Sequence, residues 1–308
     1  LLLGLLIGFG VAYYVDYLDN TVKEPADLEK HLRVPQMGVV PRIHAGDDLF
    51  GVATVPATYV AQFPNSPISK GFRAIRTNLY FRGWRGDLKS LVITSAIPGE
   101  GKSCIATNIA ACMAQDGKKV LLVDADLRRP TIHALTAIQR APGLTDVLAA
   151  RSALADAVQR PTVGNSGEIP NLHVLASGTH CPNPAELLGS EEMGRFIQQM
   201  RAQYDLVIFD CCPVLPVTDA VLLAGRCDGA LFVVRANSTR CDIALRALGH
   251  FAAVKAKVVG AVLNGYYPQG AGGLRYGYGH YGRYGHYGHY GHYGHYGSYH
   301  SYGSDESA

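Results

Sequence analysis

The sequence predicts an α/β fold in which a doubly wound, mostly parallel sheet carries helices on both faces. Short, nearly continuous apolar runs recur through most of the chain, and stretches of helical spacing separate most of them. Strands that are buried on both faces have this composition, and crossover helices join them in parallel order. The expected strands are a run starting at Leu91 and the runs 120–123, 172–175, 206–209, 230–234 and 258–263.

A turn rich in Gly and Pro joins the first of these strands to a helix that continues toward Gly117. Backbone N–H groups of such a turn bind phosphate oxygens, while a Lys reaches the β and γ phosphates and a hydroxyl ligates Mg²⁺. Lys102 and Ser103 suit these two roles. The turn is therefore predicted to be the P-loop of an NTPase that uses ATP and Mg²⁺ rather than a turn that binds nothing. The expected nucleotide contacts are Pro98, Gly99, Glu100, Gly101, Lys102, Ser103 and Cys104.

Three Asp residues follow strands at the edge of the sheet where α/β folds bind ligands. Asp124 and Asp126 come just beyond the strand 120–123, and Asp210 follows the strand 206–209. Carboxylates near a nucleotide either hold Mg²⁺, usually through water, or accept a proton from the attacking hydroxyl. The alternative explanation is that these Asp residues are helix N-caps. This explanation accounts less well for three such residues beside a P-loop. We predict that all three belong to the catalytic site.

An apolar run, LLLGLLIGFGVAYYV, occupies the start of the chain and ends in aromatic residues that suit a membrane–water boundary. Because a spanning helix needs about 20 apolar residues, we interpret residues 1–18 as the C-terminal part of a transmembrane helix. A buried core helix is the alternative, whereas a signal peptide would need a basic start and a small-residue cleavage site. ATP and Mg²⁺ are cytosolic, so the P-loop domain is expected on the cytosolic side.

Residues 19–66 are interpreted as a juxtamembrane linker. Within it, a short helix is expected over 26–32 and a short strand over 37–40, both bounded by Pro residues. Residues 44–66 carry Gly, Pro, Asp and Asn without periodicity and are expected to form a loop.

The predicted P-loop domain spans residues 67–269 and begins with a helix. From Ser66 to Trp84 apolar residues recur at helical spacing, and Arg73 and Arg76 lie on a neighbouring face. Two further helical stretches are expected over 184–203 and 244–253.

Charge and cysteine content exclude several classes of protein. The formal net charge of +3 is small and its charges are scattered, so the chain is not expected to bind nucleic acid. The seven Cys residues are odd in number, form no C-x-x-C pair and fall mostly in expected core elements. A disulfide framework is therefore not expected, and a reducing cytosolic setting fits the chain.

The composition changes completely beyond Gly270. From Tyr278 to Tyr302 a Tyr recurs at every third position, interleaved with Gly and His. Residues 270–308 contain too little aliphatic surface to offset the entropy of ordering, so we predict a disordered tail. About 30 residues of flexible chain reach roughly 30 Å, which is enough to present Tyr to an active site.

Two other functions are compatible with such a tail. Its His residues could bind Ni²⁺ or Zn²⁺, as in metal-handling P-loop NTPases, although the chain has no Asn-Lys-x-Asp motif for guanine. A noncatalytic assembly scaffold built on the Tyr and Gly residues is the other alternative, but it would leave the P-loop and the Asp residues idle.

Together these motifs resemble those of the bacterial tyrosine kinases, the cytoplasmic kinase part of polysaccharide co-polymerases. AIPGEGKS, LLVDADLRRP and VIFDCCPVLPVTDA are similar to the family's Walker A, A′ and B motifs, and FRAIRTNLYF to the helix before the P-loop. VDYLDNTVKEPADLEKHLRVPQMGVVP is similar to the end of the family's last membrane helix and its linker. The resemblance implies a protein-tyrosine autokinase at the bacterial inner membrane, with its kinase domain on the cytoplasmic side, that regulates exopolysaccharide or capsule polymerisation and export.

The resemblance also assigns roles to individual residues. Lys102 would contact the phosphates, and Ser103 would bind Mg²⁺. Asp126 and Asp210 would position the ion through water, and Asp124 would orient or deprotonate the incoming Tyr hydroxyl. Phosphoryl transfer needs mostly positioning and charge stabilisation, so these few groups suffice.

Further implied contacts involve phosphate, the tail and partner proteins. Arg128 matches the family's Arg after the DxD pair and would interact with phosphate charge. Neighbouring molecules would phosphorylate each other's tails, and the implied partners are further copies of the chain, the polysaccharide polymerisation and export machinery and a phosphotyrosine phosphatase. The implied phosphoacceptors are Tyr276, Tyr278, Tyr281, Tyr284, Tyr287, Tyr290, Tyr293, Tyr296, Tyr299 and Tyr302.

Three positions depart from these patterns. Ala96 occupies the place of the first Gly of the general P-loop pattern, and Cys212 that of the first Pro in the family's Pro-Pro pair. The family's Glu-x-x-Arg-x-x-Arg helix assembles rings of kinase domains, and here Arg73 and Arg76 are kept while Lys70 replaces the Glu. If that Glu pairs with a neighbour's Arg, Lys70 substitutes repulsion for attraction and weakens the expected ring.

Overall fold

An eight-stranded sheet organises the residues that the computed structural model describes, which are 19–42, 58–83, 88–162 and 167–267 together with Gly4, Gly8 and Gly10. Its strand order is β1-β8-β7-β2-β6-β3-β5-β4. The strands are β1 (Gln36–Pro41), β2 (Ser90–Ser95), β3 (Val120–Asp124), β4 (Val158–Gln159), β5 (Leu172–Leu175), β6 (Leu206–Asp210), β7 (Gly229–Arg235) and β8 (Val258–Tyr266).

All neighbouring strands pair in parallel except β4, which runs antiparallel to β5 at one edge. The predicted mostly parallel sheet is therefore confirmed, and every expected apolar run is one of its strands. The two-residue strand β4 was not expected, because so short a segment carries no periodic signal.

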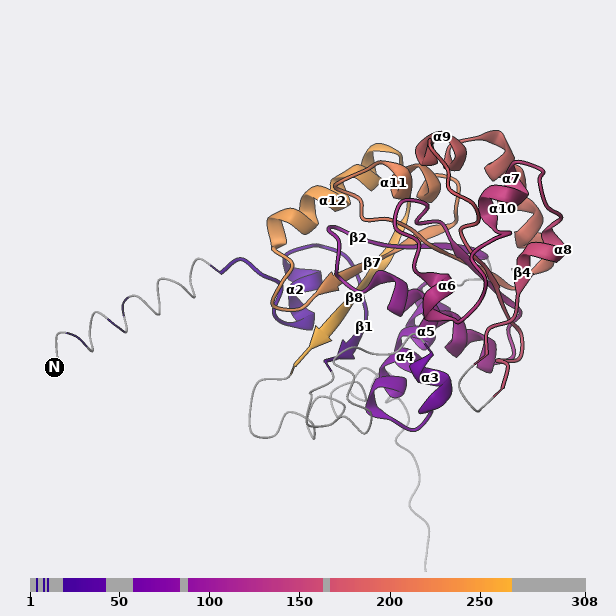
Figure 1. The fold of residues 1–308 in the computed structure, drawn as a ribbon. Helices are drawn as coiled ribbons and strands as arrows, with labels where there is room; N and C mark the ends of the chain where they lie inside the picture. The colour runs from indigo at the N-terminus through magenta and orange to yellow at the C-terminus, as the bar shows by residue number, and fades with distance from the viewer. Residues whose placement is uncertain are drawn as a thin grey trace, which may run out of the picture. The chain divides into compact units, whose positions relative to one another are not determined.

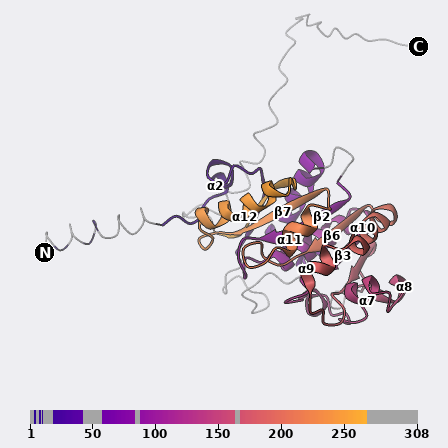
Figure 2. The ribbon, with the colours of Figure 1, turned by 90° about the horizontal axis from the view of Figure 1, so that it is seen from above.

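Helices cover both faces of the sheet, as predicted (Figures 1 and 2). In β2 the side chain of Val92 joins the core under the later helices, while Leu91 and Ile93 join the core under the earlier ones. This alternation follows from the two-residue period of a strand. The helical elements are α2 (Pro25–Lys30), α3 (Tyr59–Gln62), α4 (Pro67–Asn78), η1 (Leu79–Gly83), α5 (Lys102–Gln115), α6 (Ile132–Leu135), α7 (Leu144–Leu148), α8 (Leu154–Ala157), α9 (Pro184–Leu188), α10 (Glu191–Gln203), α11 (Asp219–Ala224) and α12 (Cys241–Ala253).

Two expected helices are subdivided. The stretch 184–203, predicted as one helix, is interrupted after Leu188, and a new helix begins where the Ser190 side chain accepts a hydrogen bond from the Met193 N–H, 3.2 Å away. This capping bond satisfies a donor that the first turn of a helix leaves unpaired. The stretch starting at Ser66 is an α-helix up to Asn78 and then a short π-helix, η1.

The segment predicted to be a linker contributes a strand to the sheet. β1 pairs in parallel with β8 and forms an edge of the sheet, and α2 packs beside these strands. The short helix and strand expected there are both present, but the pairing of the strand with the sheet was not anticipated. β8 offers β1 a full row of backbone partners, whereas a free strand would leave its own N–H and C=O groups to water. The loop predicted over 44–66 is wrong at 59–62, where α3 forms because Val60 is buried and its N–H donates to the side chain of Asn108 at 3.0 Å.

The predictions for the two ends of the chain fall on residues outside the described part. These are the transmembrane segment at 1–18, apart from its three glycines, and the tail at 270–308. Among the described residues, no helix is both long and apolar enough to cross a membrane.

Replacement of Gly143 by Ala is expected to lower the free energy of unfolding by at least about 2 kcal/mol. An added Cβ would overlap backbone atoms of Gly178 and Ala176, which cannot move aside as a side chain could. Urea denaturation would measure the loss. Gly249→Ala is the matched control, since its Cβ meets nothing within 4 Å on an exposed face of α12, and it should stabilise the protein by roughly 0.5–1 kcal/mol. Equal effects of the two changes would contradict the steric argument.

Candidate active site

The predicted catalytic residues meet at the carboxyl ends of three adjacent strands. The register of the sheet pairs Ile93 of β2 with Asp210 of β6, and Asp210 with Asp124 of β3. The P-loop leaves the end of β2 directly above this row. Residues separated by more than a hundred positions in the sequence are therefore brought together by strand order, at the edge where open α/β sheets bind ligands.

The P-loop has the backbone conformation that phosphate binding requires. Gly99 and Gly101 have φ angles of 85° and 92°, a left-handed conformation that glycine adopts without strain. Gly101 is also the N-cap of α5, so the loop delivers the N-terminus of a 14-residue helix to the site. The N–H groups of a helix's first turn and its positive dipole end favour an anion there. Any side chain at Gly101 would collide with the amide of Asn264.

Lys102 lies between two of the predicted Asp residues. Its ammonium group is 2.8 Å from Asp126 Oδ2 and 3.4 Å from Ser103 Oγ. Burial opposes its charge, but Asp210 and Asp126 outweigh burial and raise the pKa of Lys102 above its ordinary value. The other carboxylate oxygen of Asp126 accepts the N–H of Arg129 at 3.0 Å. Lys102 is thus a fixed, fully charged cation at the mouth of the P-loop.

The carboxyl groups of Asp124 and Asp210 are fully buried side by side. Burial raises the pKa of Asp210 to about 6, although Lys102 and Ser103 act in the opposite direction. Burial and the neighbouring Asp210 also raise the pKa of Asp124 well above its ordinary range. Asp124 Oδ2 accepts the N–H of Ile132 at 3.0 Å, which resembles the helix-cap role considered as an alternative. It does not exclude catalysis, because the second oxygen is not used.

Three buried carboxylate oxygens have no hydrogen-bond partner of normal geometry among the described residues: Asp124 Oδ1 and both oxygens of Asp210. Buried unpaired oxygens are costly, and such groups mark sites completed by a ligand or ion. With the Ser103 hydroxyl close by, this donor set fits a hydrated Mg²⁺. The described residues contain no cluster of three His, Cys, Asp or Glu side chains with the geometry of a protein-only metal site. Mg²⁺ does not need one, since it usually retains waters and binds substrate phosphates.

The nucleotide-free protein is expected to lose stability as the pH rises from about 4 to about 6. In this interval the folded chain keeps a proton on Asp210 that the unfolded chain releases, so the free energy of unfolding falls as the pH rises. The shift corresponds to about 2–3 kcal/mol. Urea denaturation at pH 4.5 and pH 7 with a chelator present would measure it, and Asp210→Asn should flatten the decline. Identical pH dependence in both proteins would contradict this assignment.

The side chain of Glu100 connects the P-loop to the ends of β7 and β8. Glu100 is buried and contacts the hydroxyl of Thr239, and its other oxygen accepts the N–H of Ile97 at 2.9 Å. Asn264 Nδ2 donates to the Glu100 carbonyl oxygen at 2.8 Å, and Arg235 donates to the carbonyl of Gly99 at 2.9 Å. Sequence reasoning missed this network, because two of the partners of Glu100, Thr239 and Asn264, are more than 130 positions away and belong to no motif.

Thr239→Val is expected to weaken ATP binding about tenfold without altering the catalytic Asp residues. The variant removes the hydroxyl partner of Glu100 and the acceptor of the Arg235 N–H, 3.0 Å away, and leaves a buried acid less well satisfied. Titration with a fluorescent ATP analogue would measure the affinity. Thr239→Ser keeps the hydroxyl and is the control. Equal affinities of the Val and Ser variants would show that this hydrogen bond does not position the loop.

Arg128 forms a bidentate pair with Asp219 at the start of α11. Its Nε lies 2.8 Å from Asp219 Oδ2, and its second nitrogen lies 3.0 Å from Oδ1. Arg128 is half-exposed while Asp219 is buried, so the pair orients the guanidinium beside the site. The structure thus places Arg128 near the motif residues but bound to Asp219. Asp219 was missed, although it lies within the Walker B-like segment and its negative charge could have indicated a partner for a basic residue.

Two further positions that the sequence singled out, Cys104 and Cys212, have defined backbone contacts. Cys104 follows Ser103 on α5, where the amide of Asn108 donates to its carbonyl oxygen at 3.0 Å. Cys212 is buried just after β6, and its carbonyl accepts the Thr94 hydroxyl at 2.7 Å, so the loop keeps a defined conformation without the Pro.

The two predicted interface Arg residues are on α4, away from the P-loop. Arg76 is paired with Asp116 within the same chain at 3.0 Å, and Arg73 is half-buried. The predicted phosphoacceptor tyrosines lie outside the described residues.

These features define the class of protein. A Gly-rich turn with a Lys and a Ser at a helix N-terminus, facing Asp residues from neighbouring parallel strands, is a P-loop nucleotide-binding site on an α/β sheet.

Comparison with known proteins assigns the family. A family model described as an AAA domain matches residues 89–237. Tyrosine-protein kinase YwqD of Bacillus subtilis is 44% identical over 202 residues, which are 66% of this chain and 83% of YwqD. The putative tyrosine-protein kinase EpsB of Ralstonia nicotianae is 34% identical over 281 residues, covering 90% of this chain but 36% of EpsB. The structure of the kinase domain of Escherichia coli tyrosine kinase ETK aligns with a TM-score of 0.71 and 30% identity, covering 83% of this chain and 100% of that domain. This chain belongs to the family of bacterial tyrosine-protein kinases.

Proposed function

We propose that the chain transfers the γ-phosphoryl group of ATP to tyrosine residues of its own C-terminal segment. The observation that carries this proposal is the position of Lys102, held between Asp126 and Asp210 at the mouth of a preformed P-loop. This arrangement combines a fixed cation for the transferred phosphate with buried carboxylates for the incoming nucleophile and for Mg²⁺. The same chain carries a dense series of tyrosines beyond residue 270.

In the proposed reaction, the oxygen of a tyrosine hydroxyl forms a bond to the γ-phosphorus. The bond from that phosphorus to the β–γ bridging oxygen breaks, and ADP leaves with its electron pair. When ATP enters, Lys102 would exchange part of its contact with Asp126 for the β and γ phosphates. Asp124 would orient the hydroxyl and receive its proton. The raised pKa of Asp124 suits this role, because it makes the carboxylate a better base than an ordinary Asp.

Ser103, Asp126 and Asp210 are the residues proposed to hold Mg²⁺, the two Asp side chains through water. When bound, the ion would neutralise charge that develops on the phosphate oxygens. Arg128 is proposed to contribute further positive charge, at the distance from the P-loop that its pair with Asp219 sets.

We further propose that transfer occurs between neighbouring molecules, with residues 67–269 as the kinase domain and 270–308 as the substrate segment. A mixing experiment tests this. A chain carrying Lys102→Met serves as the phosphate acceptor. A chain that keeps Lys102 but lacks the residues after Gly270 serves as the kinase. Phosphotyrosine on the acceptor supports transfer in trans, and its absence contradicts it.

The wider role proposed for the protein is regulation of exopolysaccharide or capsule polymerisation and export at the bacterial inner membrane. Residues 1–18 would be the membrane anchor, 19–66 the juxtamembrane linker, and further copies of the chain, the export machinery and a phosphotyrosine phosphatase the partners. Two considerations support this role: the apolar start of the sequence and membership of the bacterial tyrosine kinase family. An expected consequence is that tail phosphorylation, at about −1.5 to −2 charges per site, weakens assembly by repulsion.

The decisive experiment incubates the dephosphorylated chain with Mg²⁺ and ATP and maps phosphate by mass spectrometry. Lys102→Met and a chain ending at Gly270 are run in parallel. Phosphotyrosine between Tyr276 and Tyr302 that is absent from the Lys102→Met protein supports the proposal. ATP hydrolysis without phosphotyrosine would overturn it in favour of a P-loop switch ATPase.

A further inference from the structure

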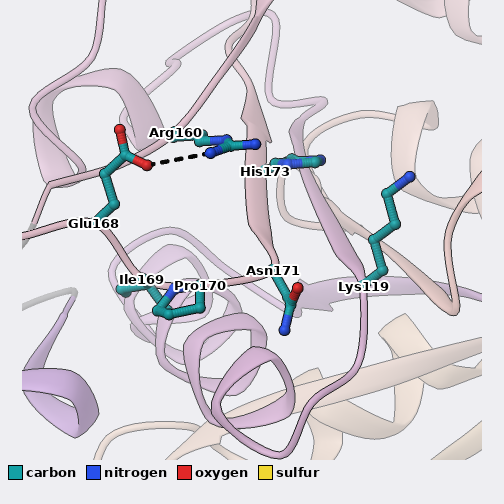
Figure 3. A pocket seen from close by; sticks show the side chains of 7 residues that line it. All are labelled: Lys119, Arg160, Glu168, Ile169, Pro170, Asn171 and His173. Carbon is teal, nitrogen blue, oxygen red and sulfur yellow. Dashed lines mark hydrogen bonds and ion pairs between the residues drawn. The ribbon is translucent and has the colours of Figure 1, made fainter.

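A second concave site lies at the edge of the sheet opposite the P-loop. Lys119 directly precedes β3 and Asn171 directly precedes β5, so this site is at the amino ends of strands whose carboxyl ends face the nucleotide. The length of β3 separates the two sites by roughly 17 Å. The cavity has a volume of about 340 Å³ and is lined by Lys119, Arg160, Glu168, Ile169, Pro170, Asn171 and His173 (Figure 3).

Three basic side chains gather around this cavity. The Arg160 guanidinium extends toward the ring of His173, and Lys119 rises on the other side of that ring (Figure 3). Burial lowers the pKa of His173, and the charges of Arg160 and Lys119 lower it further. Arg160 and Lys119 therefore place positive charge near the imidazole of His173, and this charge favours an anion in the cavity.

Neighbouring groups hold the basic side chains in position. The Lys119 ammonium lies 4.8 Å from the centre of the Tyr204 ring, and its backbone N–H donates to Asp205 Oδ2 at 2.8 Å. His173 Nδ1 is 2.9 Å from the Tyr204 hydroxyl. Tyr204 thus contacts both residues, so part of the conformational entropy of ordering them is lost before a ligand binds.

Among the described residues that line the cavity, Glu168 is the one acid. Its carboxylate lies 3.5 Å from the Arg160 guanidinium, and the two side chains are 53% and 64% exposed. An exposed ion pair at this distance is weak, so a group with two negative charges can displace Glu168 from Arg160. The wall beside it is apolar, formed by Ile169 and Pro170 (Figure 3). Basic groups beside an apolar wall match a phosphate carried on an aromatic ring.

We propose that this cavity binds phosphotyrosine in the C-terminal segment of a second copy of the chain. Arg160 and Lys119 would contact the phosphate, and Pro170 the tyrosine ring. The proposal rests on the proposed function, because the kinase reaction would produce this ligand. It adds a product-binding site away from the active site, where a phosphorylated tail is held so that the P-loop is free for another acceptor.

The test measures binding of a synthetic peptide, residues 286–294 with phosphate on Tyr290, to the dephosphorylated full chain without ATP, by fluorescence anisotropy. We expect the phosphopeptide to bind at least about tenfold more tightly than the unphosphorylated peptide or inorganic phosphate. Binding should persist with saturating Mg²⁺-ADP, since the P-loop is a separate site. Preference for inorganic phosphate, or competition by Mg²⁺-ADP, would overturn the proposal.

Removing the charge of Arg160 and removing the charge of Glu168 are expected to change phosphopeptide affinity in opposite directions. Arg160→Gln should weaken phosphopeptide binding about tenfold, and Glu168→Gln should strengthen it several-fold by removing the competing carboxylate. Arg195→Gln is the matched control, because Arg195 is also exposed and paired with a Glu, at 2.7 Å on α10, and it should change nothing. Equal losses in Arg160→Gln and Arg195→Gln, or weaker binding in Glu168→Gln, would overturn the site. Because the peptide is phosphorylated chemically, a chain that fails to phosphorylate its own tail would leave these results interpretable.

Discussion

Replacement of Lys102 by Met is expected to abolish tyrosine phosphorylation, with a rate at least about a hundredfold below that of the unmodified chain, or about 2.7 kcal/mol of activation free energy. The side chain supplies the fixed positive charge at the P-loop, and Met has similar length without that charge. Phosphotyrosine formation from labelled ATP, followed over time, measures the effect.

The same substitution should also alter the empty protein. Lys102 is the cation between Asp126 and Asp210, and its loss leaves two buried carboxyl groups without a counter-charge. The free energy of unfolding should fall by about 3 kcal/mol near neutral pH. Lys102→Arg keeps the charge and should retain most of the stability while losing activity, because its planar head cannot occupy the ammonium position. Full activity in Lys102→Met would contradict the assigned role.

Replacement of Asp124 by Asn is expected to lower kcat by a factor of about 10² to 10⁴ while the affinity for ATP changes little. The amide of Asn cannot receive the proton of the tyrosine hydroxyl. Its oxygen can still accept the N–H of Ile132, which Asp124 Oδ2 now accepts at 3.0 Å. The substitution therefore separates proton transfer from the structural hydrogen bond.

The two explanations of Asp124 make opposite predictions for this variant. If Asp124 serves only to cap the segment that leads into α6, Asn should preserve both stability and kcat. If it orients or deprotonates the acceptor, kcat should fall although thermal unfolding and nucleotide binding are nearly unchanged. Rapid-quench measurement of phosphoryl transfer, with nucleotide affinity determined separately, distinguishes the two outcomes.

The share of each relative that this chain covers determines which proposals can be tested on it. The kinase domain of ETK is covered completely by this chain, whereas EpsB extends well beyond it. The proposed reaction can therefore be tested on this chain, while the proposed role in polysaccharide export needs an assay in cells.

The local chemistry of the site could be predicted from the sequence by itself. The P-loop is a continuous segment whose Gly, Lys and Ser residues act through neighbouring backbone and side-chain atoms, so its motif is sufficient to locate it. The apolar runs likewise identified the long strands, because a strand buried on both faces consists of consecutive apolar residues that are visible in the local sequence. The placement of Asp124 and Asp210 at strand ends followed from the same runs.

Only the tertiary structure decided which distant residues support that chemistry. The contact of Glu100 with Thr239, the pairing of Arg128 with Asp219 and the addition of β1 beside β8 all join segments far apart in the chain. These contacts depend on strand order and register, and a periodic pattern carries no information about which strand lies next to which. The basic cavity at the opposite edge also depends on strand order. Its residues come from the starts of β3 and β5 and from the segment between β4 and β5, and no motif links them.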